Sequence, residues 1–173
     1  MNALSAQLCH EMHELATTLN KVEFCEENGV RAVVVTGEGK AFSAGRDLKE
    51  SKTHSEEEAA KYQRDAIMAV FEFSKVPVPT LVAVNGAAFG WGMELACAAD
   101  FRMAANEATM CFPETALGIF PGAAGSVLLP RLIGMQRAKD LIYTARRFQG
   151  EESVAMGLCM ESHPKVDLLE KAL

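Results

Sequence analysis

The chain has 173 residues, of which 49% are hydrophobic, and its 17 Lys and Arg against 23 Asp and Glu give a formal net charge of −6. This length suits one well-filled core and is short for two domains. A net negative charge gives no general attraction to nucleic acid or anionic lipid, and the most basic stretch is the pair Arg146-Arg147. No hydrophobic run approaches the roughly 20 residues that span a bilayer. We therefore expect a soluble, single-domain protein that binds neither nucleic acid nor membrane.

The cysteines predict a reducing compartment. Their number is odd and none forms a C-x-x-C pair, which argues against both a disulfide framework and a zinc ribbon: Cys9, Cys25, Cys97, Cys111 and Cys159. The N-terminal residues have neither the charge and hydrophobicity pattern of a signal peptide nor the bias of a transit peptide. We expect an intracellular protein, with cytoplasm, mitochondrion and peroxisome equally compatible with the sequence.

The hydrophobic spacing predicts an amphipathic helix over residues 5–28, which ends at Asn28-Gly29. A strand over 31–36, expected to be buried on both faces, leads into a glycine-punctuated loop and a short helix near Leu48. Further along, the patterns predict helices over 56–74, 91–99, 123–132, 135–146, 151–156 and 166–172, and strands over 80–84, 101–103 and 109–112. Strands that alternate with helices in this way indicate an α/β domain with largely buried strands.

Three local motifs resemble known functional motifs, but each lacks a required residue or spacing. His10 and His13 are spaced i, i+3, whereas a zinc-binding metalloprotease helix needs i, i+4, so a surface-helix role is favoured. The glycine pairs that begin at Gly37 and Gly90 each lack the third glycine of a dinucleotide fingerprint. Ser43 stands in a sequence like that of a nucleophile elbow but without its first glycine.

Two loops remain with a coherent chemistry, over 42–49 and 85–95, and each follows a predicted strand. Ligands of α/β domains usually bind at the carboxyl ends of strands. The second loop enters a helix near Trp91, where free backbone N–H groups and the helix dipole favour a developing negative charge, as in an oxyanion hole. Its small residues would let a ligand approach the backbone. The alternative is that its glycines only form a tight strand-to-helix turn.

Glu94 and Glu114 are the candidate acid/base residues. Glu94 lies in the first turn of the predicted helix, where compensation of the helix dipole would also explain it. Glu114 follows Pro113 after a predicted strand and could be an ordinary turn residue. Together, beside an oxyanion site, two carboxylates suit proton transfer on a carbonyl compound. Sequence spacing alone does not show that they meet.

Three segments, Val30–Lys49, Val84–Leu95 and Phe112–Gly122, resemble in the same order the enoyl-CoA hydratase/isomerase (crotonase) family, and Leu129–Gly134 extends the similarity. The resemblance implies an α/β spiral of repeated β-β-α units that binds an acyl-CoA substrate, uses no further cofactor or metal, and assembles as a homotrimer or hexamer. It also implies that residues 1–173 are a single core domain lacking the family's N-terminal strands and C-terminal helices.

The resemblance assigns roles by motif position. It makes the backbone N–H groups of Arg46 and Trp91 the oxyanion donors, although the family commonly has a small residue at both positions, and it makes Glu94 and Glu114 the catalytic pair that holds and activates water. An alternative for the Arg46 side chain is contact with an acyl carboxylate or a CoA phosphate, and Lys49 could equally be a solvated charge. The substrate-binding positions would be Ala44, Asp47, Leu48, Lys49, Gly90 and Gly122, with Gly122 opening a helix that faces the site.

A pair of glutamates favours hydration, so the expected function is that of an enoyl-CoA hydratase, a lyase of fatty acid metabolism. One alternative is an enoyl-CoA isomerase, which moves a proton with one carboxylate. Another is a catalytically silent crotonase-fold binding protein, for which the acidic run Glu56–Glu58 disfavours RNA as the partner.

Overall fold

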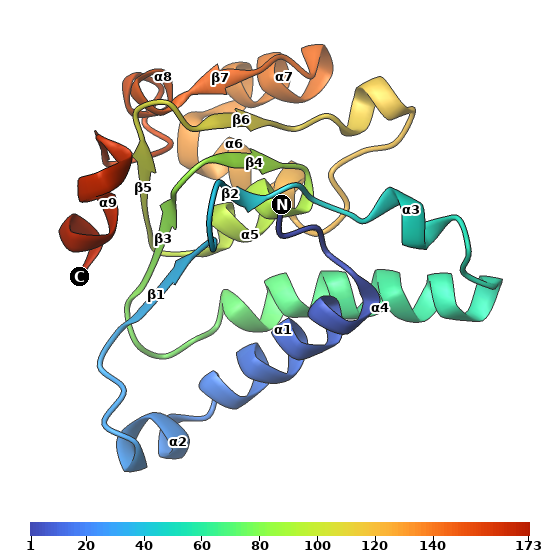
Figure 1. Cartoon of the computed structure of the whole chain (residues 1–173), viewed down its shortest axis with the longest axis horizontal. Helices are drawn as coiled ribbons and strands as arrows, with labels where there is room; N and C mark the ends of the chain where they lie inside the picture. Colours follow the sequence, from blue (N-terminus) through green and yellow to red (C-terminus); the bar gives the residue numbers. More distant parts are fainter.

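The computed structural model describes residues 1–173 as two four-stranded sheets covered by helices (Figure 1). One sheet has the order β1-β3-β5-β8 and the other the order β2-β4-β6-β7. All neighbouring strands are parallel except β6 and β7. The strands are β1 (Val33–Thr36), β2 (Ala41–Ser43), β3 (Thr80–Val84), β4 (Ala87–Phe89), β5 (Phe101–Ala105), β6 (Thr109–Cys111), β7 (Phe148–Gln149) and β8 (Glu161–His163).

From β1 to β6 the chain alternates between the sheets, placing one strand in each before it enters helices. The predicted α/β class and the repeated β-β-α order are therefore confirmed. The helices are α1 (Ala6–Leu19), α2 (Val22–Glu27), α3 (Leu48–Ser51), α4 (Glu56–Phe73), α5 (Trp91–Ala98), the 3-10 helix η1 (Glu114–Leu117), α6 (Gly125–Ile133), α7 (Met135–Thr144), α8 (Gly150–Ala155) and α9 (Lys165–Ala172).

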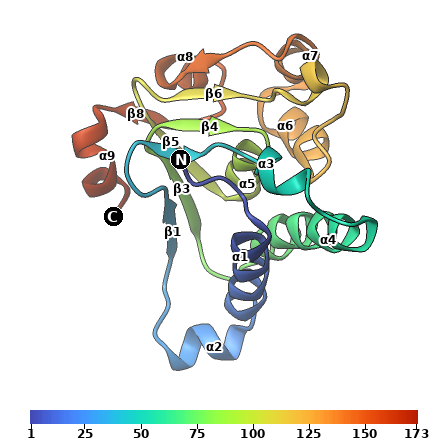
Figure 2. The same ribbon diagram turned by 45° about the vertical axis from the view of Figure 1, so that its right-hand side comes forward.

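Helices α1 and α4 pack along each other, and Figures 1 and 2 place α1 and α2 at the end of the molecule opposite α7 and α8. The start of α4 is fixed by a capping box, in which Ser55 Oγ accepts the N–H of Glu58 and the Glu58 carboxylate accepts the N–H of Ser55. One hydrophobic core joins the sheets to α4, α5 and α6, and its fully buried side chains include Val70, Val82, Phe112 and Leu129.

The single helix predicted over 5–28 is wrong, because the chain forms α1 and α2 with a break at Asn20 and Lys21. Lys21 is extended, with φ −85° and ψ 116°. The Asn20 side chain donates to Glu72 Oε2 of α4 at 2.8 Å, so a contact between helices holds the break. Local hydrophobic spacing carries no information about that contact.

Four short strands were not predicted, and two of them, β2 and β4, lie inside the expected glycine loops. They pair with each other in parallel. With three residues each they are too short to show a period in the sequence. Strands β7 and β8 were missed for the same reason. Strand β1 is also not buried on both faces: it lies at the edge of its sheet, its valines are half-buried and Thr36 is exposed.

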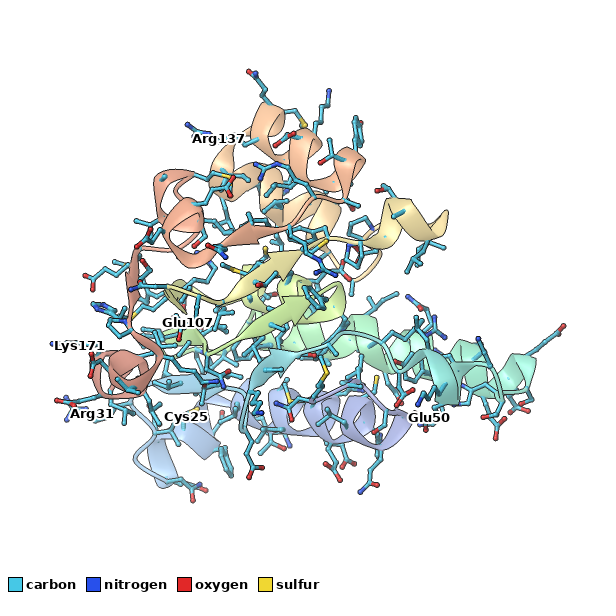
Figure 3. The ribbon with its side chains drawn as sticks, turned by 45° about the horizontal axis from the view of Figure 1, so that its top comes forward. Cys25, Arg31, Glu50, Glu107, Arg137 and Lys171 are labelled. Carbon is cyan, nitrogen blue, oxygen red and sulfur yellow. The ribbon has the colours of Figure 1, made fainter.

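The cysteines are free thiols, as the sequence predicts, and the structure shows in addition that all of them are buried. Cys25 in α2 is labelled in Figure 3. None of the helices combines the length and the apolar character that crossing a membrane requires.

Candidate active site

The site begins where β2 and β4 end. Because these strands are parallel neighbours, their carboxyl ends bring Gly45 and Gly90 side by side. Gly45 has φ +77°, and a Cβ atom there would lie 2.6 Å from the carbonyl oxygen of Phe89 and 3.7 Å from the backbone nitrogen of Trp91. Only glycine permits both this conformation and this approach. The two loops of the sequence prediction therefore meet through their backbones.

Two backbone N–H groups at this junction have no protein acceptor. In the bridge between Leu4 and Arg46, the N–H of Leu4 donates to the carbonyl of Gly45, and the N–H of Asp47 donates to the carbonyl of Leu4. The N–H of Arg46, which lies between these two bonds, has no acceptor in the protein. Trp91 is the first residue of α5, where an N–H has no partner within the helix. Both donors predicted from the motifs are available to an oxygen atom of a ligand.

A cavity of about 460 Å³ opens beside this junction. Five of the predicted residues line it, namely Arg46, Trp91, Glu94, Glu114 and Gly122, so the structure brings the two glutamates together. The rest of its wall is mostly apolar and consists of Leu4, Tyr62, Gln63, Ala66, Gly118, Ile119, Phe120 and Ala123.

Glu94 lies in the first turn of α5 and is only 4% exposed. Its Oε1 accepts the backbone N–H of Ala123 at 2.8 Å and that of Gly125 at 2.9 Å. Burial raises the pKa of Glu94 to about 7, the nearby charge of Glu114 adds to that effect, and the two hydrogen bonds oppose it. A carboxyl group with this pKa exchanges a proton near neutral pH.

Glu114 opens the 3-10 helix η1 and is also buried. Its Oε1 lies against Gly90, where a Cβ atom would be 3.0 Å away. Its Oε2 is buried without a hydrogen-bond partner. Burial raises the pKa of Glu114 above its ordinary value. Buried polar atoms in proteins nearly always have partners, so this oxygen is a ready acceptor for water or substrate.

The two large side chains at the donor positions turn toward α4. The Trp91 indole donates to the carbonyl oxygen of Ala66 at 2.8 Å. The Arg46 guanidinium lies 4.6 Å from the centre of the Tyr62 ring, and its Nε donates to Ser51 Oγ at 2.9 Å. Arg46 and Trp91 therefore form walls of the cavity together with α4.

The remaining predicted binding residues lie outside the cavity lining. Ala44 and Gly90 belong to the backbone junction itself. The Asp47 carboxylate caps α3 by accepting the N–H groups of Lys49 and Glu50. Leu48 and Lys49 are exposed on α3. Contact of these residues with CoA stays a prediction.

Helix α6 begins at Gly125, which corrects the expectation that it opens at Gly122. Ala124 precedes it with φ +93°, a left-handed conformation that ends the loop. This turn aims the N–H groups of Ala123 and Gly125 at Glu94. Sequence reasoning missed Ala123 and Tyr62 as site residues. Helical spacing marks one side of α4 as buried but does not show which loops it covers.

The chain matches known proteins over its whole length. The family model described as enoyl-CoA hydratase/isomerase matches residues 1–173. The chain is 44% identical over 129 residues to the enoyl-CoA isomerase/hydratase fer4 of Mycosarcoma maydis, which covers 74% of this chain and 47% of that protein. It is 38% identical over 158 residues to the mitochondrial methylglutaconyl-CoA hydratase of Homo sapiens, which covers 91% of this chain and 45% of that one.

Among solved structures, that of an enoyl-CoA hydratase from Bacillus anthracis is similar with a TM-score of 0.90 and 42% identity, covering 98% of this chain and 64% of that chain. The chain thus spans about half to two thirds of the length of these relatives. The fold is the α/β crotonase fold, and the chain belongs to the enoyl-CoA hydratase/isomerase family.

Proposed function

We propose that the protein is an enoyl-CoA hydratase that adds water across the double bond of a 2-enoyl-CoA thioester. One observation carries the proposal: Glu94 and Glu114, which come from different elements, line one cavity beside the unpaired N–H groups of Arg46 and Trp91. Relatives named as hydratases support it.

In this mechanism the thioester oxygen accepts hydrogen bonds from the N–H groups of Arg46 and Trp91. Addition at the third carbon of the acyl chain turns the thioester into an enolate, and the negative charge develops on that oxygen. The two donors are fixed by the paired strands, and the N-terminus of α5 adds its dipole. Donors that are already in place stabilise the transition state without reorganisation.

The two carboxyl groups bind the attacking water and transfer protons. Glu94 is oriented by the N–H groups of Ala123 and Gly125, and Glu114 offers its unpartnered Oε2. Together they hold one water molecule and accept a proton from it as its oxygen bonds to the third carbon. A carboxyl proton then passes to the second carbon, so that the sum of the two transfers is the addition of one water.

A second candidate is enoyl-CoA isomerase activity, which needs one base. The asymmetry of the pair favours it, because Glu94 Oε1 is occupied by two backbone donors whereas Glu114 Oε2 is free. The relative from Mycosarcoma maydis carries both activities in its name.

The discriminating experiment supplies a 2-enoyl-CoA and a 3-enoyl-CoA separately in water labelled with heavy oxygen. A hydratase consumes the conjugated thioester and incorporates the label into a 3-hydroxyacyl product. An isomerase converts the 3-enoyl to the 2-enoyl compound without taking up label. Binding of CoA thioesters by folded protein with turnover of neither contradicts both activities and supports the silent binding protein.

A further inference from the structure

The side chain of Arg46 is a charged group in the cavity that the proposed hydration does not use. It is half-buried and lines the cavity. The ion pairs made by arginine in this chain belong to Arg146, so no carboxylate of the protein neutralises Arg46. The carboxylates of Glu94 and Glu114 line the same cavity but form no ion pair with Arg46. A guanidinium that has lost part of its hydration and has no ion-pair partner favours an anionic ligand.

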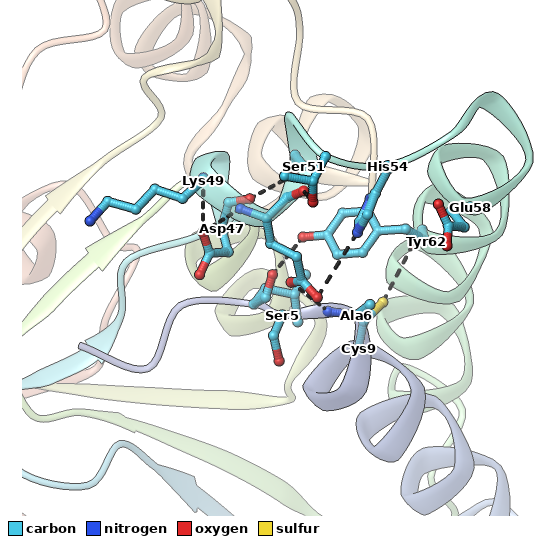
Figure 4. A network of polar contacts seen from close by, with 12 residues as sticks. Ser5, Ala6, Cys9, Asp47, Lys49, Ser51, His54, Glu58 and Tyr62 are labelled. Carbon is cyan, nitrogen blue, oxygen red and sulfur yellow. Dashed lines mark hydrogen bonds and ion pairs between the residues drawn. The ribbon is translucent and has the colours of Figure 1, made fainter.

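The guanidinium is fixed on two sides. Its Nε donates to Ser51 Oγ, and the Ser51 hydroxyl in turn donates to the carbonyl of Asp47. Its plane lies over the Tyr62 ring, whose hydroxyl donates to the carbonyl of Leu4 at 2.7 Å. Figure 4 shows Ser51 next to Asp47, and His54 beside the Tyr62 ring. The network orients the guanidinium but leaves its two terminal nitrogens nearly unoccupied.

The terminal nitrogens have a second donor beside them. Arg46 Nη1 makes one long contact, 3.5 Å to Gln63 Oε1, and Nη2 makes no hydrogen bond with the protein. The Nε2 of Gln63 also donates to no protein atom and lies 3.8 Å from the Cβ position of Gly122 at the cavity wall. A guanidinium edge and an amide NH₂ group therefore face the same cavity as free donors, which is the chemistry that binds a carboxylate or a phosphate.

We infer that Arg46, assisted by Gln63, is a specificity-determining residue that binds an anionic group of the substrate. The inference rests on the proposed function, in which the N–H of Arg46 binds the thioester oxygen. The same residue would then hold the reacting carbonyl through its main chain and a second, anionic group through its side chain. The two sources of such a group are a carboxylate on the acyl chain and a phosphate of CoA.

The test measures binding of saturated thioesters, which cannot be hydrated, so its result is independent of turnover. Glutaryl-CoA carries an acyl carboxylate, valeryl-CoA has a methyl group there, and glutaryl-pantetheine keeps the carboxylate but lacks the nucleotide phosphates. Dissociation constants are measured by calorimetry for the wild type, for Arg46→Met and for the matched control Arg64→Met. Arg64 is an exposed cation of α4 next to Gln63 and does not line the cavity.

Arg46→Met is expected to weaken binding of both glutaryl thioesters by about 10- to 100-fold, as loss of a hydrogen bond to a charged group does, with valeryl-CoA changed by less than about 3-fold. Equal weakening of the two CoA thioesters, with glutaryl-pantetheine unchanged, would assign the anion to a phosphate of CoA. The inference is overturned if Arg46→Met changes no ligand by more than about 3-fold, if Arg64→Met has the same effect, or if the folded wild type binds none of the three.

Discussion

Gly125 donates its N–H to Glu94 Oε1 at 2.9 Å and lies so close to that side chain that a Cβ atom at position 125 would be 2.9 Å from Glu94 Cγ. The same glycine therefore anchors the carboxylate and leaves room for it. Within a helix, alanine is ordinarily more favourable than glycine by about 0.5–1 kcal/mol. At this position, its methyl group would instead displace Glu94.

Gly125→Ala is therefore expected to lower the turnover of a 2-enoyl-CoA by roughly 100-fold, because a displacement of the order of 1 Å in a catalytic group has that effect. Ser126→Ala, at the exposed neighbouring position of the same turn, is the control and should keep its activity. A Gly125→Ala variant as active as Ser126→Ala would show that the position of Glu94 does not control turnover.

Glu94 should make stability depend on pH between its unfolded and folded pKa values. Its pKa is raised from 4.5 to about 7 by burial, so the folded state binds this proton more tightly than the unfolded state. The resulting contribution to stability is fully present below pH 4.5 and is lost as the pH rises through 7. Over this range the wild type should lose about 3 kcal/mol of unfolding free energy relative to Glu94→Gln.

Urea denaturation of both proteins at several pH values measures this difference. Parallel pH profiles for the wild type and Glu94→Gln would mean that the carboxyl group is not perturbed in the folded state.

Two substitutions of Trp91 separate the effect of its backbone N–H from the effect of its indole. Trp91→Pro lacks the N–H, whereas Trp91→Ala keeps it, and both lose the indole that is bonded to Ala66. Each should be destabilised by about 3–5 kcal/mol, and proline is compatible with the first turn of a helix. Turnover by Trp91→Pro should be roughly 100- to 1,000-fold below that of Trp91→Ala, the effect of one oxyanion donor. Equal activity of the two folded variants would exclude this N–H as a donor.

The parts of the fold that were predicted from sequence are those with local signals. Helix α4 and strand β3 lie where the sequence predicts them, over 56–74 and 80–84, because the helical spacing and the prolines before Thr80 are local signals. The break at Asn20 depends on a contact with Glu72, and the short strands β2 and β4 depend on each other. Neither contact can be predicted from the local spacing of hydrophobic residues.

The same distinction holds for the site. The motifs identified Glu94 and Glu114, since both stand at fixed places beside a strand end and a helix start. They did not identify Tyr62 or Gln63, because the part of α4 that covers the cavity is decided by how that helix packs. The left-handed turn at Ala124 was also not foreseen, since alanine gives no sign of positive φ.

Ala145, like Ala124, has a positive φ, and replacing it with glycine tests this backbone conformation. Ala145 ends α7 with φ +49° and ψ +27°, a conformation that glycine adopts at helix ends without cost. Ala145→Gly should raise the unfolding free energy by about 1 kcal/mol. Ala60→Gly, at an exposed position within α4, should lower it by about the same amount. Urea denaturation measures both, and destabilisation of the two variants alike would contradict the left-handed conformation at position 145.

The most direct test of the central claim, that Glu94 and Glu114 act together on one water, is the rate of hydration of a 2-enoyl-CoA by Glu94→Gln, Glu114→Gln and the double variant. Each single change keeps the shape of the side chain and removes its capacity as a base, so each should lower kcat by roughly 100- to 10,000-fold. The double variant should be little slower than the slower single variant, because residues that act as a unit are not additive. Full hydration by either folded single variant, or additive losses in the double variant, would contradict the shared water.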